Sequence, residues 1–242
     1  MPGNKKRSYL RTWRNSLHSE NCTHYTYEVK NGTRKLLSGE TLAIASEDQI
    51  RRSLKQGYEL ELMTDEEREK RNEENRRKRN NRVRRNSGNN KSEQLSIVLV
   101  TNPEEVTEAL NEVKGGRLLK RNVDTLTTGD LWKTRTIIGY FSELKHSKER
   151  TVIRVVKNGS FLDIKFEEAF FAAAPEYQEM FHLIERFAKE NGGIIIVATG
   201  EVKRNEEKNE FSVSVFDKHG LLVQGKSLID LAREYALGHF DL

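Results

Sequence analysis

Short runs of alternating apolar and polar residues fill the second half of the chain and predict β-strands. The runs cover residues 134–145, 151–157, 160–166, 194–203 and 210–216. Between the second and third runs stands Asn158-Gly159, the strongest short-range signal of a β-hairpin. Between the third and fourth runs, Pro175 opens a helical pattern that stops at Asn191-Gly192-Gly193. The pattern therefore predicts five strands with one helix between the third and the fourth.

The first half of the chain predicts a smaller arrangement of strands and a helix. Residues 41–45 predict a strand, and Ser46 with Gln49 predicts a helix that begins with a capping box. Gly57 stands where a C-cap glycine belongs. We therefore expect the helix to end there and residues 58–63 to form a closing strand.

A charged segment with Val83 as its one aliphatic residue separates the two halves. Thr64 and Glu67 predict the start of a second helix, which is mostly acidic at first. The purely basic stretch that follows contains Arg76, Arg77, Lys78, Arg79, Arg82, Arg84 and Arg85. Because nothing here can pack a core, we expect an exposed helix that frays into a disordered linker near Asn86. The run has two interpretations, an arm that binds phosphates or a solvated linker helix.

Further elements flank the five strands. Residues 95–100 form a strand of the buried type, and Asn102-Pro103 predicts the start of a helix. After the strands, Gly220 turns the chain, Ser227 caps a last helix and Gly238 ends it. This mixture of elements predicts an α+β protein.

The domain organisation follows from these patterns. We expect a basic N-terminal arm over 1–22 and a small α/β module over 23–63. A charged helix and disordered basic linker would cover 64–94, and a domain with the five strands and their flanking helices would cover 95–242. The boundary falls in the basic linker because few contacts can cross it.

The composition favours a polyanionic partner. The 242 residues are 33% charged and carry a net charge of +5. No apolar run approaches the roughly 18 residues that span a bilayer, so we expect no membrane contact and a cytoplasmic protein. The single cysteine, Cys22, fits a reducing compartment. With His18 and His24 it lacks the paired ligands of a zinc site, so we expect a partly buried thiol and no metal.

The sequence contains no pattern that predicts catalysis. It has no P-loop, no dinucleotide-binding glycine motif, no nucleophile elbow and no zinc-protease motif. Glu167-Glu168 could form a carboxylate pair only if both side chains reached one site, but neighbouring residues on a strand point to opposite faces. A strand that ends in solvated acids is the favoured interpretation, and we expect neither enzymatic activity nor a cofactor.

The region 134–216 resembles the OB-fold nucleic-acid-binding domains of the anticodon-binding type. The resemblance rests on the strand order, on Ile138-Gly139-Tyr140 in the first strand and on Thr199-Gly200-Glu201-Val202 in the fourth. Phe166 at the end of the third strand, followed by the helix and Gly192-Gly193, is similar as well. The resemblance implies that a bound strand lies across the second and third strands, between the loops 1–2 and 4–5.

These positions carry basic residues with an aromatic ring among them, which is the combination that single-strand binding uses. The candidate binding residues of the barrel region are Lys145, Lys148, Arg150, Arg154, Phe161, Lys165, Lys203 and Arg204, and those of the linker are the seven cations from Arg76 to Arg85. Phe161 has two interpretations, a ring that stacks on a base or a core residue. Of Tyr140 and Phe141, one should be buried and the other exposed, and the pattern does not distinguish them.

The function that these features predict is non-enzymatic binding of single-stranded DNA or RNA. We expect the chain to act as an accessory factor of a replication or transcription complex, of the kind found in phages. The alternative is a protein–protein interaction module, or an inhibitor that binds a host protein complex through its barrel, because an OB-fold does not settle function.

Overall fold

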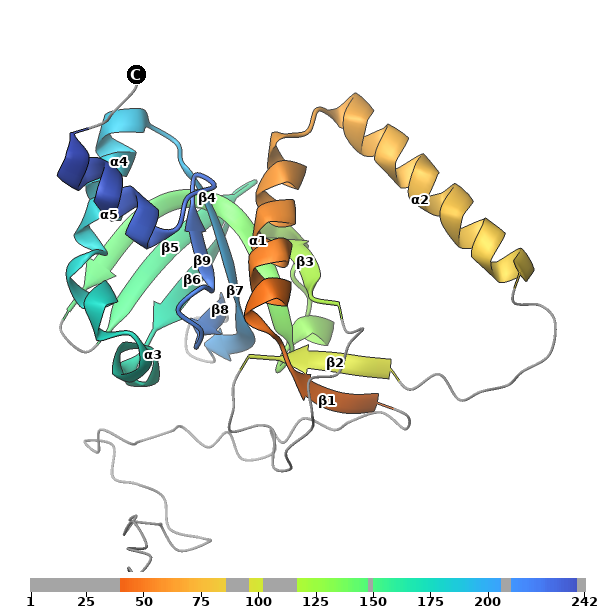
Figure 1. The fold of residues 1–242 in the computed structure, drawn as a ribbon, viewed down its shortest axis with the longest axis horizontal. Coiled ribbons are helices and arrows are strands. Elements are labelled where there is room, and N and C mark those ends of the chain that lie inside the picture. The colour runs from red at the N-terminus through yellow and green to blue at the C-terminus, as the bar shows by residue number, and fades with distance from the viewer. Residues whose placement is uncertain (1–39, 86–95, 102–116, 148–149, 206–209, 239–242) are drawn as a thin grey trace, which may run out of the picture. The chain divides into compact units, whose positions relative to one another are not determined.

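A computed structural model describes residues 40–85, 96–101, 117–147, 150–205 and 210–238 (Figure 1). Within these ranges the side chains of residues 40–42, 79–85, 96–98 and 205 are not described. No helix in the described ranges combines the length and apolar character that a membrane span requires. The predicted arm over 1–22, the part of the predicted module before residue 40 and the helix predicted after Asn102-Pro103 lie outside the described residues.

Five strands form a closed barrel. They are β4 (Thr134–His146), β5 (Thr151–Lys157), β6 (Ser160–Phe166), β7 (Ile195–Asn205) and β8 (Glu210–Val215). Their order is β4-β5-β6-β8-β7, and β4 also pairs with β7 to close the ring. This is the strand order of the OB-fold, so the predicted α+β class and the predicted barrel are both confirmed. Two short strands, β3 (Leu119–Asn122) and β9 (Leu221–Val223), extend the sheet beside β4 and β7.

The barrel closes because β4 is long and bends. Its first part, Thr134–Tyr140, pairs with β7. Its second part, from Tyr140 to His146, pairs with β5, and the register of this pairing shifts between Phe141 and Glu143. Gly139 lies just before the bend, where a Cβ atom would come within 2.7 Å of a Val123 methyl group. The predicted hairpin is confirmed between β5 and β6, where Asn158 and Gly159 have φ angles of 48° and 76°.

The predicted single helix between the third and fourth strands is wrong. The segment instead forms α3 (Glu168–Ala173), the 3-10 helix η4 (Pro175–Glu179) and α4 (His182–Asn191). The chain breaks before Pro175 because proline has no N–H and disfavours a helical residue in front of it. The pattern missed α3, whose Phe170 is buried against Phe166 with ring centroids 4.9 Å apart. Glu167 and Glu168 are exposed, and they cap and begin α3 rather than end a strand.

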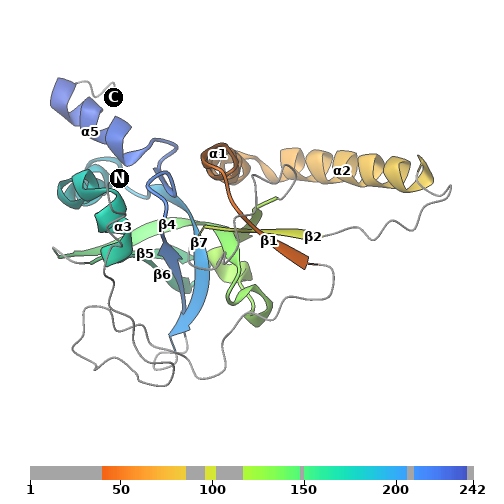
Figure 2. The same ribbon diagram turned by 60° about the horizontal axis from the view of Figure 1, so that its bottom comes forward.

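Helix α1 (Glu47–Leu62) packs outside the barrel on β4 and β7 (Figure 2). Its predicted capping box is confirmed, since the Gln49 N–H donates to Ser46 Oγ at 3.3 Å and the Ser46 N–H donates to Gln49 Oε1 at 2.8 Å. The predicted end at Gly57 and the predicted strand over 58–63 are wrong. Gly57 is buried inside the helix, where a Cβ would lie 3.0 Å from Val197 Cγ1. Glycine therefore lets α1 approach the barrel closely instead of ending the helix.

The remaining elements surround this core. Strand β1 (Glu40–Ile44) pairs in parallel with β2 (Ser96–Val100). The sequence predicted both strands but not their pairing. Helix α5 (Leu228–Leu237) begins at Ser227 and ends at Gly238 as predicted. The division into a module over 23–63 and a domain over 95–242 stays a prediction, and α1, which belongs to the predicted module, packs on β4 and β7 of the barrel.

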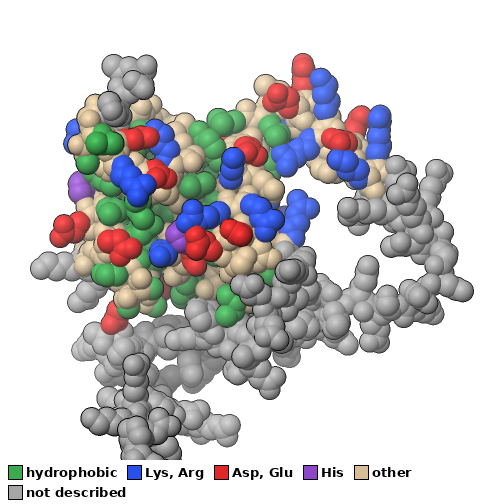
Figure 3. Space-filling view, viewed as in Figure 1, with side chains coloured by type: hydrophobic (Ala, Val, Ile, Leu, Met, Phe, Trp, Pro, Cys, Tyr) green, Lys and Arg blue, Asp and Glu red, His purple; other side chains and the backbone are tan. Residues whose placement is uncertain are grey.

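Helix α2 (Asp65–Arg85) differs from the other helices of the described ranges because it has no apolar face. Its predicted capping box is confirmed, with the Glu67 N–H donating to Thr64 Oγ1 at 3.3 Å and the Thr64 N–H donating to Glu67 Oε2 at 3.0 Å. Acidic and basic side chains are interspersed along its described part, residues 65–78 (Figure 3). Such a helix depends on capping and on ion pairs one turn apart rather than on packing.

A buried ion-pair cluster joins the 3-10 helix η3 (Thr128–Asp130) to the barrel. Asp130 accepts from Arg135 Nε at 2.6 Å and from Arg121 Nε at 3.2 Å, and both Asp130 and Arg135 are buried. Burial alone would raise the pKa of Asp130, but the hydrogen bonds from Arg135 and Arg121 outweigh it and lower the pKa. The short 3-10 helix η2 (Val123–Thr125) precedes this cluster and buries Val123 in the barrel core.

Candidate nucleic-acid interface

The outward side chains of five neighbouring strands form a surface that we call the barrel face. Strand pairing places two rows of residues side by side across it. The first row is Glu143, Arg154, Asp163, Ser212 and Lys203. The second row is Lys145, Val152, Lys165, Ser214 and Glu201. The barrel face consists of these residues and Phe161.

Phe161 is the exposed aromatic ring of the barrel face. It is 47% exposed, while Leu162, Ile164 and Phe166 on the other side of β6 are buried. The predicted alternation on β6 is therefore confirmed, and the interpretation of Phe161 as a core residue is wrong. The Arg154 guanidinium carbon lies 5.7 Å from the centroid of the ring, within the range of a cation–π contact.

Two carboxylates fix Arg154 in this position. Its Nε donates to Asp163 Oδ1 at 2.9 Å, and its Nη2 donates to Glu210 Oε2 at 2.8 Å. The hydrogen bond with Asp163 is the main reason that the pKa of Arg154 is raised. A guanidinium held on two sides loses little further freedom when a ligand arrives, so its planar surface is preorganised beside Phe161.

Two lysines of the barrel face also lie beside acids. Lys145 Nζ is 3.4 Å from Glu143 Oε1, and Lys203 Nζ is 3.4 Å from Glu201 Oε2. Each pair joins the two rows along one strand. These acids are why the face is less positive than its count of lysine and arginine suggests.

Lys165 is the lysine of the barrel face that does not lie beside an acid. It is partly buried, and among the described residues it has no carboxylate within ion-pair distance. Burial lowers the pKa of Lys165, and the charges of Arg150 and Lys203 lower it further, while Glu167 and Asp163 act in the opposite direction. Lys165 is therefore a desolvated cation among other cations, which is a property typical of functional sites.

The loops beside the barrel face are described only in part. Arg150 is exposed, and its N–H donates to Ser147 Oγ at 3.2 Å, which shapes the turn between β4 and β5. Arg204 is exposed at the end of β7. Lys148 and residues 206–209 of the loop between β7 and β8 lie outside the described residues. A depression on the barrel face is lined by Glu143, Lys145, Val152, Arg154 and Asp163 of β4, β5 and β6.

All seven candidate cations of the predicted linker belong to α2. Arg76, Arg77 and Lys78 are exposed, whereas the side chains of Arg79, Arg82, Arg84 and Arg85 are not described. Acids of the preceding turn reach two of them, with Lys78 Nζ 2.6 Å from Glu74 Oε1 and Arg77 Nη2 3.6 Å from Glu73 Oε2. The hydrogen bond from Lys78 lowers the pKa of Glu74. The start of the basic run is thus partly neutralised, and the sequence offers no acid to the cations that follow.

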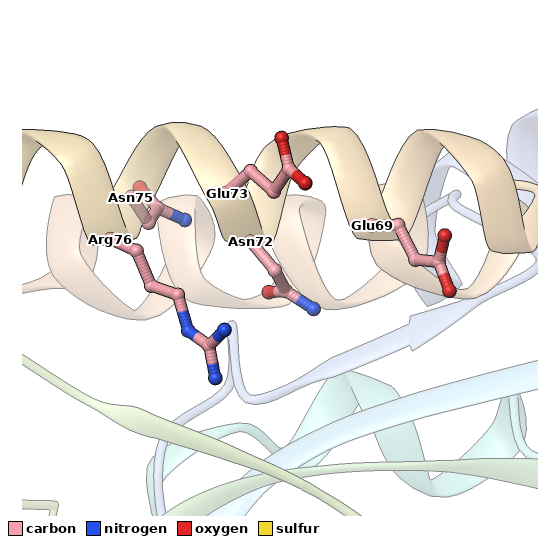
Figure 4. A pocket seen from close by; sticks show the side chains of 5 residues that line it. All are labelled: Glu69, Asn72, Glu73, Asn75 and Arg76. Atoms are coloured by element: carbon pink, nitrogen blue, oxygen red, sulfur yellow. The ribbon is translucent and has the colours of Figure 1, made fainter.

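A hollow beside α2 is lined by Glu69, Asn72, Glu73, Asn75 and Arg76 (Figure 4). All of these side chains are polar and come from one helix, so the hollow lacks the apolar walls of a small-molecule pocket. Within the described ranges, no three potential metal ligands come together. Cys22, His18 and His24 lie outside them.

Three residues of this region were not singled out from the sequence. Ser212 and Ser214 occupy the middle of the barrel face, but a serine in a strand pattern carries no signal of its own. Glu61 lies at the end of α1, where it accepts from Tyr140 Oη at 2.8 Å and pairs with Lys157. Of the neighbouring aromatic residues on β4, Tyr140 therefore points outward and Phe141 packs on the core, a choice that the sequence pattern left open.

Comparison with known proteins adds limited information. No protein-family model and no curated protein matches the chain. OBody AM3L09, solved in complex with hen egg-white lysozyme, is 14% identical with a TM-score of 0.31, over 44% of this chain and 94% of the OBody. Aspartyl tRNA synthetase from Entamoeba histolytica is 16% identical with a TM-score of 0.33, over 44% of this chain and 21% of the synthetase. The S. pombe Stn1-ten1 complex is 15% identical with a TM-score of 0.25, over 43% of this chain and 66% of that chain. These overlaps carry no argument about function, and the OB-fold assignment rests on the strand order.

Proposed function

We propose that the chain binds single-stranded nucleic acid without catalysing a reaction. In this proposal the barrel face contacts bases, and the basic half of α2 contacts phosphates. The observation that carries the proposal is Phe161, which is an exposed ring on the strand that OB-folds place beneath a bound single strand. Exposing a large aromatic ring has a cost in water that binding to a base would remove.

The surroundings of Phe161 support the same function. A base that stacks on the ring gains about 1–3 kcal/mol whatever its identity, because every base has a π-face. Arg154 borders the ring and offers a second planar group. Asp163 and Glu210 neutralise Arg154, so this contact should depend little on salt.

Helix α2 contributes a different kind of attraction. Each phosphate that a cation neutralises releases counterions and steepens the dependence of affinity on salt, by about 0.7 in slope for a single strand. Seven cations between Arg76 and Arg85 can supply this term without reading sequence. We therefore assign salt-sensitive attraction to α2 and base contact to the barrel face.

The wider setting is proposed on the same grounds. A basic chain with a stacking surface and an electrostatic arm suits an accessory factor of a cytoplasmic replication or transcription complex, as in phages. A barrel that binds another protein is the competing function.

Fluorescence anisotropy with labelled single-stranded DNA and RNA tests the proposal. The wild type should bind at least one of them, and Phe161→Ala should weaken binding about 5- to 150-fold. Leu237→Ala is the matched control, because Leu237 is also exposed but belongs to α5. Its affinity should equal that of the wild type. Absence of binding to both nucleic acids at low salt would reject the proposal and favour the protein-binding alternative.

A further inference from the structure

A buried hydroxyl on the barrel face has no hydrogen-bond partner. Ser214 is 2% exposed, and its Oγ contacts no donor or acceptor among the described residues. By contrast, the buried Thr136 Oγ1 of the barrel is 2.8 Å from Thr199 Oγ1 and 2.7 Å from Ser53 Oγ. Among the described residues the other buried hydroxyl without a partner is that of Thr101, which follows β2 outside the barrel. Buried polar groups are nearly always hydrogen-bonded, so an unpartnered one calls for an explanation.

The same position lies beside the exceptional lysine. Strands β6 and β8 run parallel, and Lys165 is the register partner of Ser214. Both side chains point outward, because Ile164 and Val213 between the outward positions are buried in the core. Lys165, whose ammonium group has no carboxylate within ion-pair distance, and Ser214, whose hydroxyl has no partner, are therefore neighbours across two adjacent strands.

We infer that Lys165 and Ser214 form a subsite for one phosphate group on the barrel face. The inference rests on the proposed function, which it deepens by placing a backbone phosphate of the bound strand at the junction of β6 and β8. The ammonium would supply the charge and the hydroxyl a hydrogen bond. Arg150 and Lys203, whose charges act on Lys165, add positive potential around the subsite.

The neighbouring acids do not argue against an anion here. Asp163 is bound by Arg154, and Glu201 lies beside Lys203. Their charges are thus compensated within the barrel face, while Lys165 has no carboxylate within ion-pair distance among the described residues. The other acid whose charge acts on Lys165 is Glu167, which is exposed to solvent. Burial and two nearby cations would make the free lysine less stable in its charged form, and a phosphate would relieve that penalty.

The subsite is separate from the stacking position. Phe161 and Lys165 are on the same side of β6, and the rise of a strand separates them by about 13 Å. A phosphate at Lys165 therefore leaves the ring of Phe161 free to stack. The two contacts can be removed independently.

The first arm of the test uses the labelled single strand at several salt concentrations. Lys165→Gln should weaken binding about tenfold or more and flatten the slope of log affinity against log salt by about 0.7. Lys165→Arg should restore the slope of the wild type. Ser214→Ala should weaken binding about two- to tenfold and leave the slope unchanged. Lys189→Gln is the matched control, because Lys189 is exposed on α4 and does not belong to the barrel face. It should leave both affinity and slope unchanged.

The second arm measures acylation of lysine side chains by peptide mass mapping, with and without inorganic pyrophosphate. Pyrophosphate should protect Lys165 and leave Lys189 reactive. If the single strand binds but Lys165→Gln behaves like Lys189→Gln, the subsite is wrong and the proposed function stands. If pyrophosphate protects Lys165 but no single strand binds, the subsite stands for free phosphate compounds and the proposed function fails. Absence of protection together with an unchanged slope overturns the inference.

Discussion

The two basic regions of this protein, the barrel face and helix α2, treat their positive charges in opposite ways. On the barrel face Arg154 is bound by two acids, one of which comes from a strand distant in sequence. In the basic run of α2, Arg77 and Lys78 are compensated from one turn away, by Glu73 and Glu74. A sheet brings together charges that the sequence separates, whereas a helix pairs only near neighbours. A count of cations therefore predicts the local charge of α2 well and that of the barrel face poorly.

The largest expected effect separates the parts by truncation. A fragment of residues 92–242 contains every barrel strand and α3, α4 and α5, so it should still melt cooperatively. It should lose about 3–6 kcal/mol of unfolding free energy, because Ile50 and Leu54 of α1 no longer cover the barrel. Denaturant unfolding of fragment and full chain measures this difference. A fragment without a cooperative transition would show that the predicted domain boundary is wrong.

The next effect compares ion pairs in the two environments. Asp130→Asn should cost about 3–5 kcal/mol of stability, because it leaves the buried Arg135 without its carboxylate. Glu74→Gln on α2 should cause no measurable loss, since its pair with Lys78 is exposed. Chemical denaturation at neutral pH compares the two variants. Equal losses of stability in the two variants would show that the buried and the exposed ion pairs do not differ in their contribution to stability.

The pH dependence of stability tests the same pair. The pKa of Asp130 is lower in the folded protein than in the unfolded chain, where it is near the ordinary value of 3.8. Its stabilising contribution is therefore present above that value and is lost as the pH falls through the lowered pKa. Asp130→Asn should flatten this acid-induced loss, measured by thermal melts between about pH 2 and pH 5.

Phe161→Ala should separate binding from folding. The affinity for a single strand should fall by about 1–3 kcal/mol, while the stability changes little because the ring is exposed. Ile164→Ala is the control on the same strand, and because Ile164 is fully buried it should cost about 2–5 kcal/mol of stability. Thermal melts and anisotropy are measured on both variants. A large loss of stability for Phe161→Ala with none for Ile164→Ala would show that the exposed and buried faces of β6 are assigned the wrong way round.

The smallest effect on the fold is expected from α2. Replacing Arg76, Arg77, Lys78 and Arg79 with Ala should leave the unfolding free energy nearly unchanged, because α2 buries no apolar face. The slope of log affinity against log salt should flatten by about 0.7 for each phosphate that the variant no longer neutralises. An unchanged slope would identify α2 as a solvated linker helix.

The sequence predicted most of the barrel because its signals are local. Asn158-Gly159 defined one hairpin, and alternation placed Leu162, Ile164 and Phe166 in the core. It failed at Gly57, since a glycine that permits close helix packing looks the same as one that ends a helix. The predicted basic character of the barrel face was also incomplete, because the partners of Arg154 come from other strands through long-range pairing. Ser214 could not be found from sequence, as its unpartnered hydroxyl is a property of the folded sheet.

Single-strand affinity extrapolated to 1 M salt tests the division of labour between Phe161 and α2 most directly. At that salt concentration the counterion term vanishes and the contacts that do not depend on charge remain. The account predicts that the loss of affinity caused by Phe161→Ala persists at 1 M salt. The loss of affinity caused by replacing the four cations of α2 with Ala should disappear there. A loss from Phe161→Ala that vanishes at 1 M salt, or a loss from α2 that persists there, would contradict it.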